Sequence, residues 1–227
     1  MGLIKFWGAH RSDLYDIMCE TVDPEGRILA RVRSLCPWDD RLVMDIGCGR
    51  GDHALVMARD AGVVVAADAD ERMVNRTRAR ALGVHPSLCV LHADVTDLPL
   101  ASESLDVVYA FWAYFFGEGE KGLRECERVL RPGGALCVVQ NRGGDELSQL
   151  WSDSEFSCLQ WGLWFEERGF ASFSVNSYWR FPSMDEAVLL VRYLWGERGL
   201  QVLLRRQTLQ FGFSASIYCK RRGAGLI

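Results

Sequence analysis

The sequence has no long apolar run: no uninterrupted apolar stretch approaches the roughly 20 residues that a membrane-spanning helix needs. The first residues also show neither the hydrophobic stretch nor the cleavage site of a secretion signal. Met1-Gly2 would suit N-myristoylation, but Phe6 stands where that signal needs Ser or Thr. We therefore expect a cytoplasmic protein with no membrane partner.

Closely spaced cysteines and an excess of positive charge are also missing. The eight cysteines lie at least eleven residues apart, so the Cys-x-x-Cys spacing of zinc and redox sites does not occur. The net charge is −4 and the pI is near 5.6, which disfavours a polyanionic partner. We predict no metal, no disulfide and no nucleic-acid partner.

A glycine-rich segment, LVMDIGCGRGD, is the most informative pattern that is present. Its apolar residues predict a buried strand over 42–46, and the glycines that follow permit a tight turn and close approach of a ligand to the backbone. A dinucleotide-binding loop would need a third glycine at position 52, where this chain has Asp52. Instead, Asp45 precedes Gly47 by two residues.

Acidic residues also follow the next predicted strands. The strand over 63–67 ends at Asp68, and the strand over 88–92 is followed by Asp94. A fourth strand over 105–110 precedes the helix-end and turn sequence ERVLRPGG, and a fifth strand covers 135–139. Strands that alternate with helices predict parallel crossover connections, which place these acids at one edge of a sheet.

These features, in this order, resemble the class I S-adenosylmethionine-dependent methyltransferases, specifically the small-molecule type 11-like group with the R-V-L-x-P-G-G turn. The resemblance implies a Rossmann-like, doubly wound α/β fold with seven strands, of which the last is antiparallel. We expect one domain over 1–227. It would comprise an N-terminal helical cover (1–40), a cofactor-binding core (41–140), and substrate-side and C-terminal strands (141–227).

Other elements follow from local signals. The Asp23-Pro24 pair predicts a helix from Glu25 to Leu35, and Ser183 with Glu186 forms a capping box. The remaining expected helices cover 50–61, 71–82, 119–130, 155–168 and 183–197. Two further strands are expected over 172–180 and 209–218.

By resemblance, each part of S-adenosylmethionine is assigned to a group of residues. Asp45 faces its ammonium group, the Gly47–Gly49 amides its carboxylate, Asp68 its ribose and Asp94 its adenine amino group. The expected cofactor-binding residues are Asp45, Gly47, Cys48, Gly49, Asp68, Ala69, Met73, Asp94, Val95 and Phe111. Asp45 and Asp68 could instead cap helix N-termini.

The acceptor is less clear from the sequence. The loop after the fourth strand lacks the [DN]-P-P-[YF] and Pro-Cys motifs of nucleobase methyltransferases, and its aromatic residues suggest an apolar small molecule. Tyr15, Trp112 and Tyr114 are candidate substrate contacts. His53 is interpreted as a capping or solvent-exposed residue, and no catalytic base is identified.

We predict methyl transfer to oxygen or nitrogen of a small molecule. An RNA-modifying methyltransferase and a non-catalytic S-adenosylmethionine-binding module remain alternatives. A nicotinamide-dependent enzyme is disfavoured by Asp52.

Overall fold

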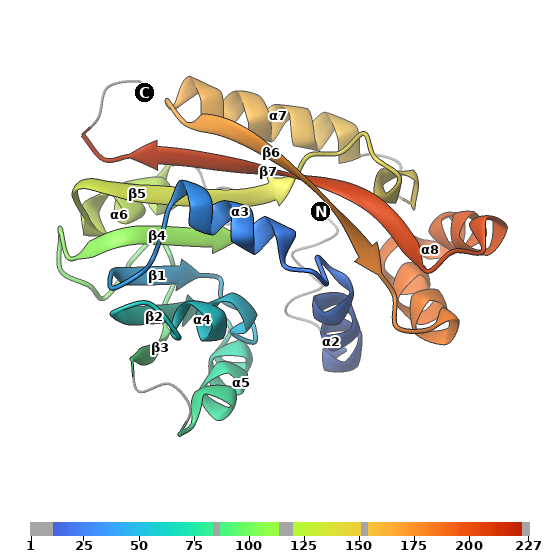
Figure 1. The fold of residues 1–227 in the computed structure, drawn as a ribbon, viewed down its shortest axis with the longest axis horizontal. Coiled ribbons are helices and arrows are strands. Elements are labelled where there is room, and N and C mark those ends of the chain that lie inside the picture. Colours follow the sequence, from blue (N-terminus) through green and yellow to red (C-terminus); the bar gives the residue numbers. More distant parts are fainter. Residues whose placement is uncertain (1–10, 84–86, 114–119, 151–153, 224–227) are drawn as a thin grey trace. The chain divides into compact units, whose positions relative to one another are not determined.

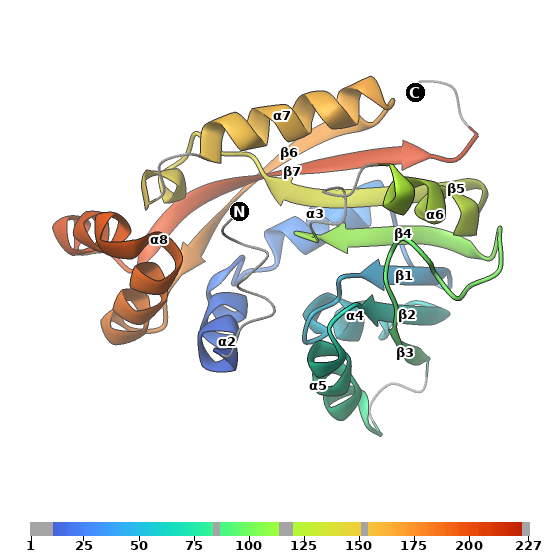
Figure 2. The ribbon, with the colours of Figure 1, turned by 180° about the vertical axis from the view of Figure 1, so that it is seen from behind.

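The computed structural model describes residues 11–83, 87–113, 120–150 and 154–223, apart from the side chains of 154–159. Seven strands form one sheet in the order β3-β2-β1-β4-β5-β7-β6 (Figures 1 and 2). The strands are β1 (Leu42–Ile46), β2 (Val63–Asp68), β3 (Leu88–His92), β4 (Leu105–Phe111), β5 (Leu130–Asn141), β6 (Ala171–Arg180) and β7 (Gln210–Arg221). Figure 1 shows the last strand, β7, antiparallel to β5, so the predicted fold class is confirmed.

The helices of the described residues are α2 (Ser12–Thr21), α3 (Arg27–Leu35), α4 (Asp52–Met57), α5 (Glu71–Ala81), α6 (Lys121–Val129), α7 (Ser154–Glu167) and α8 (Met184–Arg206), with a 3₁₀ turn at Leu147–Leu150. Seen from opposite sides, Figures 1 and 2 place the end of α3 and helix α6 on opposite faces of β4 and β5. Within the described residues, no helix has the length and apolar character required to cross a membrane.

The first five strands are parallel, and β1 to β4 are aligned at their carboxyl ends. Ile46 of β1 pairs with Ala67 of β2 and with Ala110 of β4, and Ala67 pairs with Leu91 of β3. These four residues therefore form one row across the sheet. Each strand continues beyond this row into a loop, so the residues that follow all lie at the same edge.

The strands lie where the sequence predicts them, but the bounds of several elements differ, among them α4, β5 and α3. Helix α4 is shorter than the predicted 50–61: it ends at Met57 with Ala58 as its C-cap, and Ala61 forms an isolated antiparallel bridge with Asp39. The predicted turn at Pro132–Gly134 lies inside β5, which begins at Leu130 and shifts register against β4. Helix α3 begins at Arg27 rather than at Glu25.

Asp23 nevertheless caps α3 as its sequence position suggests. Its two carboxylate oxygens accept hydrogen bonds from the amides of Arg27 (3.1 Å) and Ile28 (2.9 Å). Its backbone φ is +50°, so Pro24 and Glu25 form a turn that comes before the helix. The cap residue was predicted correctly and the first helical residue was not.

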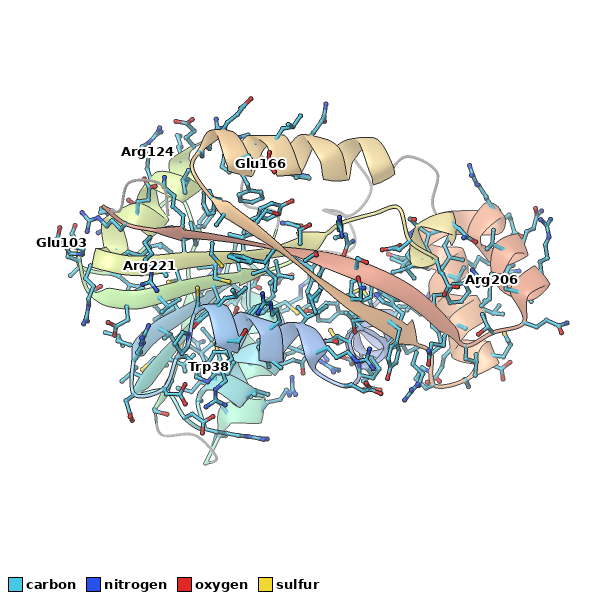
Figure 3. The ribbon with its side chains drawn as sticks, turned by 45° about the horizontal axis from the view of Figure 1, so that its top comes forward. Trp38, Glu103, Arg124, Glu166, Arg206 and Arg221 are labelled. Carbon is cyan, nitrogen blue, oxygen red and sulfur yellow. The ribbon has the colours of Figure 1, made fainter. Side chains whose placement is uncertain are left out.

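The chain divides into two units, which we describe separately. The second unit comprises Val32–Val139, Gly169–Ser172 and Ile217–Ile227, and it contains the first four strands. Trp38, labelled in Figure 3, is 1% exposed and packs edge-to-face on Tyr109 with ring centroids 6.0 Å apart. The Tyr109 hydroxyl donates to the Cys36 carbonyl at 2.6 Å, which satisfies a polar atom in this core.

The first unit comprises Met1–Arg31, Gln140–Arg168 and Phe173–Ser216. Ser183 Oγ accepts from the Glu186 amide at 3.2 Å, so the predicted N-cap of α8 is confirmed. The predicted helix end near 197 is wrong, because the chain breaks only locally at Gly196 (φ 63°, ψ −158°) and continues helically to Arg206. Leu200 and Leu203 are buried and give this second half an apolar face of its own.

Polar contacts tie other parts of the first unit together. Arg206, labelled in Figure 3 at the end of α8, forms an ion pair with Glu146 at 2.9 Å. The same glutamate accepts a hydrogen bond from the Gly212 amide of β7 at 2.8 Å. The sequence-based boundaries of a single domain remain a prediction.

Candidate functional site

The loop after β1 has a backbone that requires glycine. Gly47, Gly49 and Gly51 have φ values of +66°, +56° and +84°, in the left-handed region that disfavours other residues. A Cβ added at Gly47 would lie 2.6 Å from the Cβ of Ala113, which follows β4. The loop can therefore pass close to the chain beyond β4 only if residue 47 has no side chain.

Hydrogen bonds within the second unit hold this loop. The Cys48 amide donates to the Ala67 carbonyl at 3.0 Å, and the Gly49 amide donates to Asp68 Oδ2 at 2.9 Å. Thr77 of α5 donates its hydroxyl hydrogen to the Gly49 carbonyl at 2.8 Å. Two of the three amides expected to bind a ligand carboxylate are thus engaged inside the protein, and that expected contact remains a prediction.

Thr77 was missed in the sequence prediction. It lies 28 residues after Gly49 in a helix rich in arginine, and only its burial distinguishes it from an ordinary helix residue. A small polar residue among charged ones on a predicted helix is a weak signal, because threonine also occurs on solvated faces.

Asp45 has the most unusual environment at this edge. Its side chain is 1% exposed, and one carboxyl oxygen accepts from the Ala54 amide in the first turn of α4. The other oxygen, Oδ2, is buried and has no hydrogen-bond partner among the residues that the structure describes. Burial, followed by the nearby charge of Asp68, raises the pKa of Asp45 to about 8.

The capping alternative for Asp45 therefore accounts for one oxygen and leaves the other unexplained. A buried polar atom without a partner costs about 1–3 kcal/mol, so such atoms are rare unless a ligand completes them. A cation placed at Oδ2 would offset both the missing hydrogen bond and the repulsion from Asp68.

Asp68 lies at the end of β2 and is half-buried. Its Oδ1 accepts from the Asp70 amide at 2.8 Å, and burial raises the pKa of this carboxyl. Helix α5 is capped by Asp70, whose side chain accepts from the Arg72 amide, so Asp68 is not the helix cap. Each carboxylate oxygen of Asp68 retains a lone pair for a further donor.

The predicted adenine-side residues lie after β2 and β3. Asp94 is exposed, and its Oδ1 accepts from the amide (2.8 Å) and hydroxyl (2.7 Å) of Thr96, which lowers the pKa of the carboxyl. Val95 is half-buried, Ala69 is exposed, and Met73 is buried in α5. All four belong to the second unit, at or beyond the carboxyl ends of their strands.

An aromatic cluster lies at the carboxyl end of β4. Phe111 stacks on His53 of α4 with ring centroids 3.9 Å apart and an angle of 14° between the planes. The His53 ring lies 6.2 Å from that of Trp112, whose backbone has a φ of +50°. Burial lowers the pKa of His53 to about 4, so the ring is neutral at physiological pH.

His53 does not cap a helix, contrary to the sequence-based interpretation: α4 begins after Gly51 without a side-chain cap. Its position in the first turn of the helix after the glycine loop is the signal that could have suggested packing against the end of β4. Tyr114 lies outside the described residues. Tyr15 lies in α2, in the first unit, so its expected contact with the cofactor remains a prediction.

Together, the aligned parallel strands, the glycine loop, the acids at the carboxyl edge and the antiparallel β7 define the class I methyltransferase fold. Residues 44–138 match the family model described as a methyltransferase domain. Over this stretch, which is less than half of its length, the chain is therefore similar to a methyltransferase domain.

Named relatives agree with this assignment. The chain is 34% identical over 113 residues to the demethylmenaquinone methyltransferase of Clavibacter sepedonicus, covering 49% of this chain and 46% of that protein. It is 32% identical over 144 residues to the 27-O-demethylrifamycin SV methyltransferase of Amycolatopsis mediterranei, covering 60% and 53%. The chain thus spans about half the length of these relatives.

A solved structure supports the fold. The S-adenosylmethionine-dependent methyltransferase of Aquifex aeolicus aligns with a TM-score of 0.58 at 17% identity, covering 93% of this chain and 98% of that one. At this identity the likeness concerns the fold alone.

Proposed function

We propose that this protein binds S-adenosylmethionine at the carboxyl edge of β1–β4 and transfers its methyl group to a small organic acceptor. The observation that carries the proposal is the buried Oδ2 of Asp45, which has no hydrogen-bond partner in the described part of the chain and lies near a second carboxylate. The donor set suits a cation, and S-adenosylmethionine carries a positive sulfonium and a positive ammonium group. When bound, it supplies an activated methyl group.

The residues of this edge would hold the cofactor in the following way. Asp45 would accept from the ammonium group, Asp68 from the ribose hydroxyls and Asp94 from the adenine amino group. Ala69 and Met73 would lie against the adenine, with the Val95 amide at its ring nitrogen. Gly47, Cys48, Gly49 and Phe111 would line the amino-acid end.

Methyl transfer requires alignment and exclusion of water more than acid–base chemistry. Well-oriented intramolecular reactions gain about 7–11 kcal/mol from such alignment. The stacked pair of His53 and Phe111, with Trp112 beside it, offers an apolar surface directly after β4. His53 is neutral there, so it would act by packing unless an acceptor contacts its ring nitrogens.

We propose an oxygen or nitrogen atom of a small molecule as the acceptor. Two relatives whose names refer to small-molecule methylation, and the negative net charge of this chain, support a small molecule as the acceptor. Trp112, Tyr114 and Tyr15 are proposed substrate contacts, and the cytoplasm is the proposed location. An RNA acceptor would instead require binding that weakens steeply with salt.

The test is transfer of a labelled methyl group from S-adenosylmethionine to a panel of phenols, hydroxyquinones and amines. We expect labelled product from at least one class and no label on bulk tRNA. Product from tRNA alone would contradict the choice of acceptor. Tight cofactor binding with no transfer to any acceptor would instead indicate the non-catalytic binding module. Asp68→Ala serves as the binding-deficient control in each reaction.

A further inference from the structure

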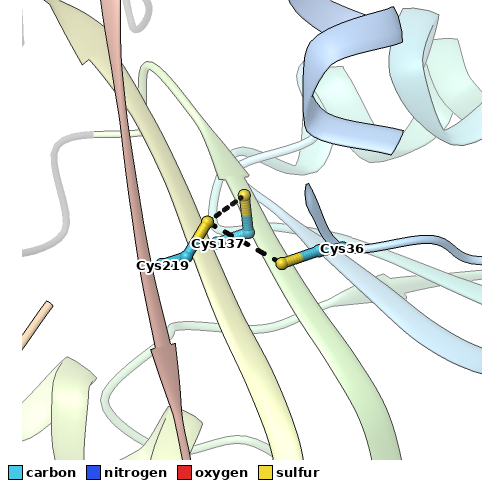
Figure 4. Close-up of side chains that lie close together, drawn as sticks. All are labelled: Cys36, Cys137 and Cys219. Carbon is cyan, nitrogen blue, oxygen red and sulfur yellow. Dashed lines mark hydrogen bonds between the residues drawn. The ribbon is translucent and has the colours of Figure 1, made fainter. Parts of the chain in front are cut away.

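Three cysteine side chains from separate parts of the sequence converge in the second unit (Figure 4). Cys36 follows α3, Cys137 lies on β5, and Cys219 lies on β7. The Cys219 sulfur is 3.7 Å from that of Cys36 and 3.6 Å from that of Cys137. All three sulfurs lie within 4.8 Å of one another.

The sheet register explains two of the three positions. Arg142 lies five residues after Cys137 and donates to the carbonyl of Ser214, which lies five residues before Cys219. In the other direction, Gly134 lies three residues before Cys137 and Arg222 lies three residues after Cys219. The Arg222 amide donates to the Gly134 carbonyl. In this antiparallel register Cys137 faces Cys219 in a non-hydrogen-bonded pair, the arrangement in which side chains approach most closely.

The position of the third sulfur, that of Cys36, depends on backbone hydrogen bonds outside the β5–β7 pair. The Cys36 carbonyl accepts the Tyr109 hydroxyl hydrogen at 2.6 Å, and the Cys36 amide donates to Val32 at the end of α3. These bonds fix the backbone that directs Cys36 toward the sheet. Cys36 and Cys137 are buried and Cys219 is half-buried, so the cluster is shielded on most sides.

The three thiols share one favoured site for negative charge, at Cys36. Contacts with the Cys137 and Cys219 thiols lower the pKa of Cys36, whereas the pKa values of Cys137 and Cys219 are raised. A thiolate is the form of cysteine that binds metal ions.

We propose that Cys36, Cys137 and Cys219 form a three-thiolate binding site for Zn²⁺. A Zn–S bond of about 2.3 Å in tetrahedral geometry separates the sulfurs by about 3.8 Å, close to the observed 3.6 and 3.7 Å. A disulfide would use only two of the three sulfurs, at about 2.05 Å, and would leave the third unexplained. Binding releases the thiol protons to solvent and transfers no electrons.

The fourth coordination position would be open to water at the half-buried Cys219. In the part of the chain that the structure describes, no fourth cysteine, histidine or acid joins this group. The sequence predicts no metal site because the three ligands are separated by 101 and 82 residues, so no local spacing reveals them (137 minus 36, and 219 minus 137). This proposal replaces that prediction and does not depend on methyl transfer.

The test uses the full chain, reduced and freed of metal with a chelator, and titrated with Zn²⁺ against a coloured competitor. We expect one Zn²⁺ per chain, and with Co²⁺ a thiolate-to-metal charge-transfer band in the near ultraviolet. Cys36→Ser, Cys137→Ser and Cys219→Ser should each weaken Zn²⁺ binding at least about tenfold, or about 1.4 kcal/mol.

Two other cysteines provide matched controls. Cys126→Ser alters a thiol that is also fully buried, and Cys89→Ser alters an exposed one, so both should bind Zn²⁺ like the parent. The proposal is overturned if the reduced parent binds no Zn²⁺, gives no charge-transfer band, or binds Zn²⁺ equally in all five variants. A disulfide at Cys219 in a protein that fails to bind Zn²⁺ would also overturn it. Because the parent alone tests the first two outcomes, a variant that fails to fold does not decide the result.

Discussion

Replacing Asp45 by asparagine should stabilise the ligand-free protein while weakening its affinity for S-adenosylmethionine. The carboxyl is buried, and its pKa is raised from 3.8 to about 8 by burial and by Asp68. An unfolded chain ionises this group freely above about pH 4. The fold therefore loses stability as pH rises from about 4 to about 8, because the folded state holds a proton that the unfolded state releases.

The size of the effect follows from the same shift. About three pH units separate the unfolded pKa of this carboxyl from pH 7, and over that range only the folded state keeps the proton. Each unit is worth about 1.4 kcal/mol, which gives about 4 kcal/mol at pH 7. The asparagine side chain accepts from Ala54 but buries an unpartnered amide, which costs about 1–3 kcal/mol. The expected net gain is about 2 kcal/mol. Loss of a charged contact should weaken cofactor binding by roughly tenfold to a hundredfold.

Urea unfolding of the parent and of Asp45→Asn measures the difference in stability. Calorimetric titration measures the difference in affinity for S-adenosylmethionine. The stability difference should widen by about 3 kcal/mol between about pH 5 and about pH 8. Asp97→Asn, which changes an exposed carboxylate, should show neither effect. An Asp45→Asn protein that is less stable at pH 8, or that binds the cofactor as tightly as the parent, would refute the reasoning.

Three further changes test other parts of the site. Asp68→Ala should weaken S-adenosylmethionine binding by one to three orders of magnitude, about 1.4 kcal/mol each, while circular dichroism shows the fold retained; unchanged affinity would mean that the ribose lies elsewhere. Gly47→Ala should lower the free energy of unfolding by about 1–3 kcal/mol, because of its positive φ and the contact with Ala113. Ala113→Gly should restore part of that loss, and no restoration would argue against the contact. Thr77→Val should lower stability by about 1–3 kcal/mol by leaving the Gly49 carbonyl unpaired, and should also weaken cofactor binding; an unchanged chemical denaturation midpoint would show that this bond is dispensable.

The sheet core could be predicted from the sequence because its signals are local. Apolar runs bounded by acids and glycines give β1 to β4, and the order of these elements fixes their parallel alignment. The ends of helices were less predictable. Gly199 suggests that α8 stops near residue 197, yet buried Leu200 and Leu203 extend it, since packing outweighs local preference.

The site residues likewise include some with a local sequence signal and some without one. Asp45 and Asp68 are visible because each lies at the end of an apolar run, whereas their protonation depends on burial that no spacing reveals. His53 and Thr77 act through residues far from them in sequence, so their partners emerge only from the fold. The cysteine cluster is the hardest feature to predict. It depends on the pairing of β5 with β7, which are far apart in the sequence.

Calorimetric titration of the parent protein with S-adenosylmethionine and S-adenosylhomocysteine tests the central claim most directly. The account predicts one site per chain with a Kd in the micromolar range, and proton release on binding, because Asp45 ionises when it meets the ammonium group. Absence of binding by both compounds to a protein that circular dichroism shows to be folded would contradict it.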